Sequence, residues 1–446
     1  MGKLKKESGI TLIALVVTII VLLILAGISV SMITGENGIL KKAGEASEKT
    51  KIATDKEQRR LARYEAGANI DGMVFQGVTI PAGFAPTRIE GETTIDEGLV
   101  VTDVDGNEYV WIPCEYDSES VEGVADENTV YYNDSSVEHD QHDNRDPSWK
   151  KGNWYYNGGT WYDEQPHSKT VKNSITKYHG FYVARYEAGV PKKATEFYVD
   201  PEGRGNLEYK YQNNVRNDST KIENGEIIPV SQKGSQAWNY ITQENAEKAA
   251  RKMVTNRLDV QSYLIDSHAW NTICRLLEKK YKSESNKVTN STNWGNYANN
   301  TDTKYEKIKG LWARHTFAPE KGWRPGEKYN FSNIPKKGST STHETGHIEL
   351  ATGICEDFKA YNIYDMAGNM WEWTTEEGNN NGDNTHNGSP NCNEGACPNK
   401  SGVTYVLRGG AFNIGGDSCP VVSVRGDYYN ERVDIHVGFR AVLYLK

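Results

Sequence analysis

Residues 361–374 read YNIYDMAGNMWEWT, and this stretch decides the fold together with two shorter ones, YVLRGG at 405–410 and GFRAVL at 438–443. The first stretch is dense in large apolar residues and is interrupted once, by AGN at 367–369. Gly and Asn accept positive φ at low cost, so the interruption predicts a tight turn. Large residues alternate with others after the turn and in the two later stretches. This alternation predicts three short strands.

The order YDMAGNMWEW, VLRGG, GFRAVL resembles the formylglycine-generating-enzyme (sulfatase-modifying factor) superfamily. Two earlier stretches resemble it more loosely, YVWIP at 109–113 and GFYVARYEAG at 180–189. The resemblance implies an α+β, C-type-lectin-like fold with long loop insertions. Because one fold hosts many functions, the function has to be argued from the site.

Local signals predict further elements outside these motifs. Residues 95–113 read as a β-hairpin with its turn at Asp105-Gly106-Asn107. Apolar spacing predicts helices at 242–254 and at 267–280. The hexapeptide ARYEAG occurs twice, at 62–67 and at 184–189. Two short copies do not make a repeat fold, so we interpret the first copy as coincidence or a trace of duplication.

The N-terminus predicts a membrane segment. Residues 10–33 carry a long uncharged apolar run, and Lys3, Lys5 and Lys6 precede it. A helix that rises ~1.5 Å per residue would cross the ~30 Å hydrocarbon core over this length. Lysines before such a segment stay on the cytoplasmic side. We therefore expect a membrane-anchored protein whose larger part lies outside, at the cell surface.

The same segment resembles the prepilin N-terminus, which is cut after a Gly and then N-methylated. Gly9 and Ile10 match that processing site, whereas Ala14 stands where most pilins carry Glu. Other pilins are partners under this interpretation, and a plain uncleaved anchor remains the alternative. The domain boundaries we expect are a leader at 1–9, a transmembrane or pilin-like helix and stalk at 10–66, and the lectin-like domain at 67–446.

Net charge and cysteine spacing limit the binding partners, disulfides and zinc sites that the sequence predicts. The formal net charge is -9, and no long basic run follows the N-terminus, so nucleic acid is not an expected partner. The chain has 6 cysteines, and disulfides are permitted outside the cell, but the spacing fixes no pairing. A zinc site of Cys pairs would need a second close pair, which the sequence lacks.

A calcium site is expected at the turn of the first stretch. Carboxylates and backbone carbonyls around a tight turn suit Ca²⁺. The resemblance implies structural calcium at Asp365, Gly368, Met370 and Glu372, with Gly368 and Met370 acting through their carbonyls. The alternative is that Glu372 only bonds to the neighbouring turn. No organic cofactor is expected.

Two other stretches contain possible metal ligands, but we interpret both as ordinary polar loops. HETGH at 343–347 matches the zinc motif HExxH, which needs a helix to place both His on one face. The internal Gly and the preceding Ser, Thr and Gly residues disfavour that helix, so we expect a polar loop. EHDQHD at 138–143 reads as an exposed acidic loop.

Enzymatic activity is not expected. The resemblance implies a catalytic cysteine in a GFRC-type motif, and here that position is Ala441. Cys419 lies upstream without an obvious partner. An oxidase would need a thiolate or a metal at this place, and we see no counterpart of the His-rich iron set in related enzymes.

Residues 411–437 have neither a helical period nor clean alternation. Their composition omits Lys, Gln, Met and Trp and matches, apart from Glu431, types reachable from an Asn codon by changing its adenines. This placement resembles the variable region of diversity-generating-retroelement target proteins, with an invariant frame of Arg408, Gly409, Gly410, Gly438, Phe439 and Arg440. The alternative is a surface loop with ordinary composition bias. The candidate ligand-binding residues are Phe412, Asn413, Asp417, Asp427, Tyr428, Tyr429, Asp434 and His436.

The sequence therefore predicts a surface-displayed ligand-binding protein with a diversified C-terminal site. Its expected ligand is a protein or glycan on another surface. A minor pilin or adhesin with a fixed role is the first alternative. An oxidase of the resembling superfamily is the second.

Overall fold

The structure is a computed structural model, and it contains both helices and strands, in agreement with the α+β prediction. The residues that it describes are 16–23, 38–69, 71–116, 129–132, 166–191, 215–255, 257–281, 288, 291–300, 303, 305–318, 322–324, 347–378, 404–414, 422, 425–429 and 433–446.

The chain divides into two compact units, residues 1–60 and 61–446. In the first unit, residues 16–23 are helical, and helix α2 (Ile39–Ala68) begins further along the chain. The last turns of α2 belong to the second unit, where Ala62 and Ala66 are buried. No helix in the described part of the chain is both long and apolar enough to span a bilayer. Most of the expected segment 10–33 lies outside the described residues.

A six-stranded antiparallel sheet forms the centre of the second unit. Its strands run in the order β3 (Phe84–Pro86), β4 (Val100–Asp103), β5 (Glu108–Pro113), β8 (Gly180–Ala184), β19 (Ala441–Leu445) and β9 (Val260–Leu264). Nearly every residue of these strands is buried, because the sheet is covered on both faces. Strand β19 therefore places the C-terminal motif in the core of the molecule.

A four-stranded sheet holds the other motifs. Its order is β17 (Arg425–Tyr429), β16 (Thr404–Arg408), β15 (Trp371–Gly378) and β18 (Val437–Phe439), and only β15 and β18 are parallel. Arg440 alone separates β18 from β19, so the chain passes from one sheet to the other at this residue. The two sheets are consequently linked through the GFRAVL motif.

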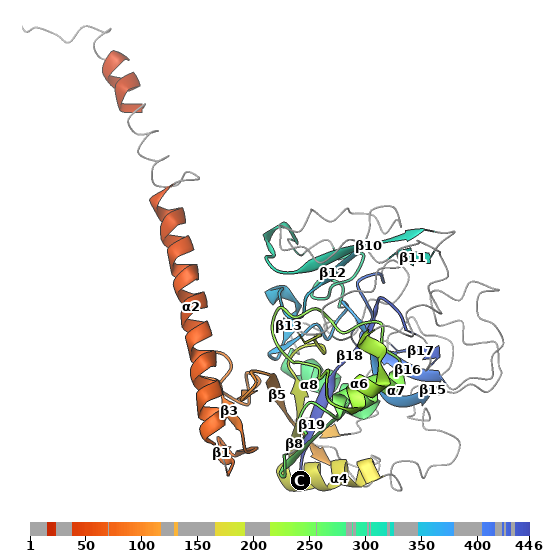
Figure 1. The fold of residues 1–446 in the computed structure, drawn as a ribbon. Helices are drawn as coiled ribbons and strands as arrows, with labels where there is room; N and C mark the ends of the chain where they lie inside the picture. Colours follow the sequence, from red (N-terminus) through yellow and green to blue (C-terminus); the bar gives the residue numbers. More distant parts are fainter. Residues whose placement is uncertain are drawn as a thin grey trace, which may run out of the picture. The chain divides into compact units, whose positions relative to one another are not determined.

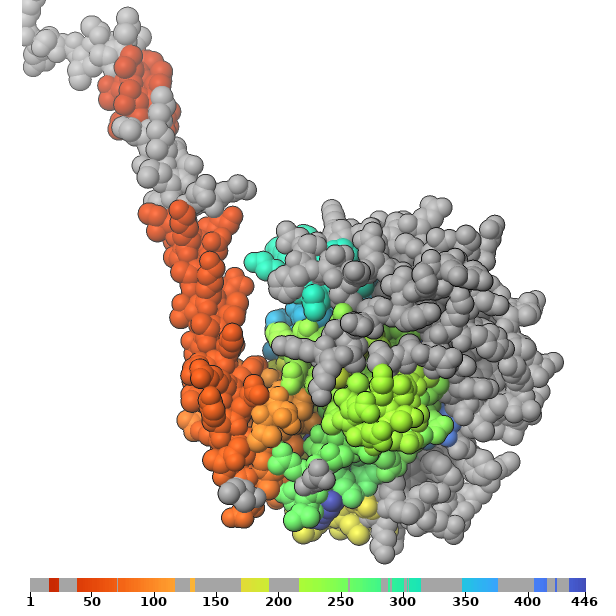
Figure 2. Space-filling view, in the orientation of Figure 1, coloured from red at the N-terminus to blue at the C-terminus, as the bar shows by residue number. Residues whose placement is uncertain are grey.

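Helices pack against these sheets (Figure 1). Helix α4 (Pro166–Tyr178) contacts β8 and β19, α7 (Gln243–Ala250) contacts β9 and β15, and α8 (Ser267–Lys280) contacts β15 and β16. Figure 2 shows residues of α6 (Ser219–Glu223) and α7, in yellow-green, on the surface of this face. The apolar faces of these helices account for much of the core around the sheets.

Shorter elements complete the second unit. They are the hairpin β1 (Met73–Phe75) and β2 (Val78–Ile80), the parallel pair β6 (Glu115–Tyr116) and β7 (Tyr131–Tyr132), the hairpin β13 (Lys359–Ala360) and β14 (Ile363–Tyr364), the three-stranded sheet β11 (Gly322–Arg324), β10 (Trp312–Ala318) and β12 (His347–Leu350), and the 3₁₀ turns η4 (Val215–Asn217), η5 (Tyr305–Lys307) and η7 (Glu356–Phe358).

The local predictions are largely confirmed. β4 and β5 form the expected hairpin, and Gly106 in its turn has φ +84°. The turn at 367–369 has positive φ at Gly368 (+74°) and Asn369 (+61°). Helix α8 has the expected bounds, while α7 begins after its N-cap Thr242 and ends at Ala250, earlier than expected. The strand β17 was not indicated by the sequence, because residues 425–429 do not alternate.

Candidate functional site

Arg440 and Glu372 form a fully buried ion pair at the point where the chain changes sheets. Nη2 of Arg440 lies 2.8 Å from Oε1 of Glu372, and Nε lies 3.1 Å from Oε2. Arg440 also donates to the backbone carbonyls of Ala184 (3.0 Å) and Tyr364 (2.9 Å). Both side chains of the pair have 0% exposure. The guanidinium thus joins strand β8, the YDMAGN stretch and strand β15.

Glu187 holds the turn of the YDMAGN stretch from the other side. Its carboxylate accepts hydrogen bonds from the backbone N–H of Met370 (2.9 Å) and from Nδ2 of Asn369 (2.6 Å). Asp365 accepts a bond from the backbone N–H of Gly353 (2.6 Å). Each carboxylate therefore binds backbone that would otherwise lack a partner in the core.

Glu187, Asp365, Glu372 and Arg440 make up what we call the buried charge set. Burial, with the charges of Asp365 and Glu372, raises the pKa of Glu187 well above its usual value. Burial also raises the pKa of Asp365 to about 7 and raises the pKa of Glu372 against the effect of Arg440. The set contains three buried carboxylates and one buried guanidinium, so full ionisation would leave two surplus negative charges. Protons or a divalent cation would balance that surplus.

The four calcium candidates all lie in this buried region. Asp365, Gly368, Met370 and Glu372 are buried, and both oxygens of Glu372 already bind Arg440. Among the described residues, no group of three or more His, Cys, Asp or Glu side chains could hold a metal ion. A calcium ion would therefore need the backbone carbonyls of Gly368 and Met370 as ligands. The surplus charge suits such an ion, and calcium here stays a prediction.

The last residue of the HExxH segment lies in a strand and not in the helix that a zinc site needs. His347 is buried and begins strand β12, where it pairs with His315 of β10. An extended backbone turns successive side chains to opposite faces, unlike a helix. His343 and Glu344, and the acidic run 138–143, lie outside the described residues.

Two of the candidate ligand-binding residues are buried in this structure. Phe412 has 0% exposure and belongs to an apolar cluster with Ala237, Tyr240, Met370, Val433 and Ile435, which we call the Phe412 cluster. His436 is 5% exposed, and its backbone carbonyl accepts from Trp371. An aromatic residue in a polar segment predicts a ligand contact, whereas the side chain of Phe412 packs inside its apolar cluster.

Of the other candidates in 411–437, two have described side chains and three have a described backbone only. Asn413 and Asp434 are half-buried. Asp427, Tyr428 and Tyr429 lie in β17, whose register with β16 pairs Tyr428 with Tyr405, and only their backbone is described. Asp417 lies outside the described residues, as do Gly9 and Ile10 of the predicted processing site.

Ala441 begins strand β19 and is completely buried, so the position of the expected catalytic cysteine carries a methyl group inside the core. Cys114, Cys274 and Cys355 are buried and form no disulfide. Burial raises the pKa of the Cys355 thiol to about 12 and that of Cys114 well above its usual value. These two thiols are therefore protonated at neutral pH. Cys392, Cys397 and Cys419 lie outside the described residues.

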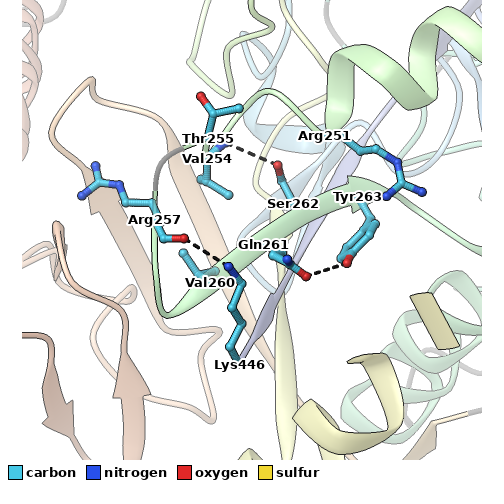
Figure 3. A pocket seen from close by; sticks show the side chains of 9 residues that line it. All are labelled: Arg251, Val254, Thr255, Arg257, Val260, Gln261, Ser262, Tyr263 and Lys446. Atoms are coloured by element: carbon cyan, nitrogen blue, oxygen red, sulfur yellow. Dashed lines mark hydrogen bonds between the residues drawn. The ribbon is translucent and has the colours of Figure 1, made fainter. Parts of the chain in front are cut away.

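A surface hollow of about 220 Å³ lies beside strand β9 (Figure 3). Its lining includes the cationic side chains Arg251, Arg257 and Lys446. Arg251 lies over the ring of Tyr263, and the two guanidinium groups point away from each other in Figure 3. The hollow contains no residue of 411–437 and none of the buried charge set. Because its cations do not converge, it is not organised as an anion site.

The sequence reasoning missed Glu187. Its signal was present, because Glu187 belongs to the second ARYEAG copy, but nothing local showed that this Glu would meet a turn 183 residues away. A buried carboxylate is rare without a partner, and that partner is visible only in three dimensions.

Comparison with known proteins places the fold in a family. The model of the family described as sulfatase-modifying factor enzyme 1-like domain (FGE-sulfatase) matches residues 136–445, more than half of the chain. Among curated proteins no match was found. The crystal structure of CarF is similar at 10% sequence identity, covering 60% of this chain and 87% of that chain with a TM-score of 0.32. On the family match, this chain belongs to the sulfatase-modifying factor enzyme 1-like family.

Proposed function

We propose that the protein is a ligand-binding protein of the cell surface, which holds a diversified binding segment at 411–437. The observation that carries this proposal is that buried groups fix the chain on both sides of the segment, at 408–410 and at 438–440. A rigid frame with replaceable residues between its fixed ends suits the binding of varied partners. The ligand is a protein or a glycan on another surface.

The frame before the segment depends on Arg408 and two glycines. Nη2 of the buried Arg408 donates to Asn271 at 2.9 Å. The carbonyl of Gly409 accepts from the hydroxyl of Tyr297 at 2.7 Å. Gly409 has φ +86°, and a Cβ there would lie 2.9 Å from the carbonyl oxygen of Met366. A larger residue would strain the backbone, so glycine is required at this position.

The frame after the segment is tied to the central sheet. The carbonyl of Phe439 accepts from the N–H of Ala188 at 2.8 Å. Arg440 follows with its pair to Glu372, and Ala441 starts β19. These contacts fix the chain where it leaves the segment.

The same positions argue against the oxidase alternative. Ala441 carries no thiol, and the two described thiols with shifted pKa values are protonated. An oxidase that used a described cysteine would need a thiolate. Iron or copper in the purified protein would restore this alternative.

We further propose that residues 10–33 anchor the protein in a membrane. Residues 16–23 are helical, and their apolar side chains are largely exposed, for example Leu22 at 59% and Leu23 at 67%. A bilayer would cover such a face. Processing at Gly9 and assembly with other pilins belong to the alternative role as a minor pilin. Methylated Ile10 in purified filaments would establish that role.

Calcium is proposed as a structural ion only. It would neutralise the surplus of the buried charge set and bind Asp365, Glu372 and the two carbonyls. If so, 1 mM EDTA should lower the melting temperature, and added Ca²⁺ should restore it whereas Mg²⁺ should not, because the smaller ion demands stricter geometry. A melting temperature that changes with neither EDTA nor Ca²⁺ would refute the proposed calcium site.

The test of the function is deep sequencing of the 3′ end of the gene across one natural population. Substitutions confined to adenine positions of codons 411–437 are expected, with the frame codons 408–410 and 438–440 unchanged. The codons of the mostly exposed helical segment 38–61 are the internal control for ordinary drift. A segment 411–437 that is as uniform as this control would overturn diversification and leave a fixed adhesin or pilus component.

A further inference from the structure

The hairpin of β1 and β2 leaves one strand edge open on the surface of the second unit. Val74, the middle residue of β1, is 70% exposed, and Met73 is 41% exposed. We propose that this edge pairs with the same edge of a second copy of the chain, antiparallel and about a two-fold axis at Val74. The contact goes beyond the proposed function, because it needs neither a diversified segment nor a ligand.

The turn of the hairpin determines which backbone groups of β1 point outward. Gln76 (φ +51°) and Gly77 (φ +83°) form a two-residue turn with positive φ at both positions, as in the type I′ turns of hairpins. The pair that flanks such a turn exchanges both backbone hydrogen bonds. The next pair, Val74 and Thr79, therefore points its N–H and C=O groups away from the hairpin. The carbonyl of Thr79 accepts from the hydroxyl of Tyr182 at 2.8 Å, which agrees with this direction.

The outward groups of Val74 are open. No described residue outside the hairpin forms a hydrogen bond with the backbone N–H or C=O of Val74. Proteins usually protect a strand edge with charged residues, with proline or by covering it. Residues 72–76 read GMVFQ and carry neither charge nor proline. The edge strands of the central sheet are protected, since β3 ends at Pro86 and Val260 and Leu264 of β9 have 0% exposure.

An identical strand is complementary to this edge. With Val74 of each copy opposite the other, the two residues exchange two backbone hydrogen bonds, one in each direction. Met73 of one copy then lies opposite Phe75 of the second copy, so apolar side chains meet and no like charges face each other. The same patch is used on both copies, so the contact closes on a dimer and does not continue into a fibre.

A further exposed apolar side chain lies near the start of β1. Leu258 is 92% exposed, the highest value among the described large apolar side chains. Its two neighbours in the chain bind Ala82, which lies shortly after β2. Arg257 donates to the carbonyl of Ala82 (3.2 Å), and the carboxylate of Asp259 accepts from its N–H (2.6 Å). Gly72, the residue before β1, is close to the same place, since a Cβ there would lie 3.4 Å from the nitrogen of Ala82. Leu258 therefore adds apolar area beside the open edge.

The pairing is expected to be reversible, because β1 has only three residues. A standard stable interface removes ~800 Å² of surface from each partner, and a short edge supplies less. The proposed anchor at 10–33 would hold copies in one membrane and so raise their effective concentration. A dimer would present two binding segments and bind a multivalent ligand with greater avidity. This last consequence alone rests on the proposed function.

The first test traps the pair with a disulfide between copies. The Cα atoms of a hydrogen-bonded antiparallel pair lie ~5.5 Å apart, a distance that a disulfide spans. The full chain carrying Val74→Cys is purified in mild detergent and oxidised, and its dimer fraction is measured on non-reducing gels. The parent chain measures dimers through the native cysteines, and Asn293→Cys, at an exposed loop position, measures chance collisions. We expect Val74→Cys to give about fivefold more dimer than Asn293→Cys.

The second test changes the edge without a cross-link. Val74→Lys places two lysines opposite each other across the axis, which is how natural edges avoid pairing. Sedimentation velocity at raised concentration should show a larger monomer fraction for Val74→Lys than for the parent. Its melting temperature should stay within about 2 °C of the parent, because the replaced side chain is exposed.

The outcomes separate the pairing from the proposed function. Equal dimer yields for Val74→Cys and Asn293→Cys overturn the inference, and so do equal monomer fractions for Val74→Lys and the parent. Either result leaves the diversified segment standing, since sequencing of codons 411–437 tests it separately. A uniform segment 411–437 together with a trapped dimer would overturn the proposed function and leave the pairing in place.

Discussion

The hexapeptide ARYEAG occurs twice in this chain, and the two copies have different structures. Residues 62–67 lie in the last turns of helix α2, whereas residues 184–189 begin at the end of strand β8 and continue into a turn. The first copy buries only its two alanines, and all six residues of the second are buried. Identical letters thus produce a surface helix end in one place and part of the core in the other.

The first copy follows the period of its helix. Ala62 and Ala66 are four positions apart and share one face, so they are buried together. Tyr64 is 64% exposed, and Glu65 pairs with Arg88 at the surface. Such contacts contribute little to stability because water competes for both partners.

The second copy distributes its side chains to distant partners. Arg185 pairs with Glu92 at 2.7 Å and with Glu108 at 3.0 Å. The hydroxyl of Tyr186 donates to Glu108 at 3.1 Å. Glu187 holds the turn of the YDMAGN stretch. The comparison teaches that the partners, and not the hexapeptide, decide what these residues do.

The largest difference between the copies should come from arginine. Arg185→Leu leaves Glu92 and Glu108 buried without their cation, which should lower the free energy of unfolding by about 3–5 kcal/mol. Arg63→Leu removes an exposed side chain and should change it by less than about 0.5 kcal/mol. Urea denaturation of both variants measures the contrast, and equal losses would break it.

The glycines should give effects of opposite sign. A Cβ at Gly189 would lie 2.5 Å from Cβ of Ser235, so Gly189→Ala should destabilise the fold by about 1–3 kcal/mol. A Cβ at Gly67 would meet Val104 at 3.8 Å, an ordinary contact. Gly67→Ala should therefore stabilise the helix end by about 0.5–1 kcal/mol. Melting temperatures that shift in the same direction in both variants would contradict the different surroundings of Gly189 and Gly67.

The tyrosine hydroxyls should differ more modestly. Tyr186→Phe removes the donor that Glu108 accepts and should cost about 1–2 kcal/mol. Tyr64→Phe at the exposed position should fall within about 0.5 kcal/mol of the parent. Denaturation midpoints of the two conservative variants provide the measurement. A loss for Tyr64→Phe equal to that for Tyr186→Phe would mean that the surface tyrosine has an energetic role of its own.

The smallest expected effect is a change in how the free energy of unfolding depends on pH when Glu187 or Glu65 is replaced. The pKa of Glu187 is raised in the folded protein, so its contribution to stability is complete below the unfolded value of about 4.3 and is lost as pH rises toward the folded value. In EDTA, stability should fall as the pH rises above about 4.5, because the buried Glu187 must then lose its proton. Glu187→Gln should reduce this slope by less than about one proton, and Glu65→Gln should leave it unchanged. Urea midpoints across this range give the slope, and identical slopes in all three proteins would contradict the raised pKa.

Much of the fold was accessible from the sequence, because its signals are local. The hairpin turn at 105–107, the turn at 367–369 and the bounds of α8 follow from residue types within a few positions. The three motifs also predicted the family, which the match at 136–445 confirms. Strand β17 was not foreseen, since its pairing with a distant strand decides it, whereas helix α2 ends at Ala68, within two residues of the expected boundary at 66.

The candidate site was less accessible. The segment 411–437 was singled out by its composition, but composition does not separate buried from exposed positions. Phe412 and His436 therefore seemed suited to contact a ligand, and the structure buries both. Asn413 and Asp434 differ from them only through what packs around each residue.

The sequence by itself determined the turns at 105–107 and 367–369, the bounds of α8 and the family, because turn chemistry and periodicity act over a few residues. Only the tertiary structure decided which charges meet. Glu372 and Arg440 are 68 residues apart, and Glu187 reaches a backbone N–H 183 residues away. Burial makes each of these partners necessary, since a charge or polar group removed from water must find its partner inside the fold. No local pattern can name that partner before the chain has folded.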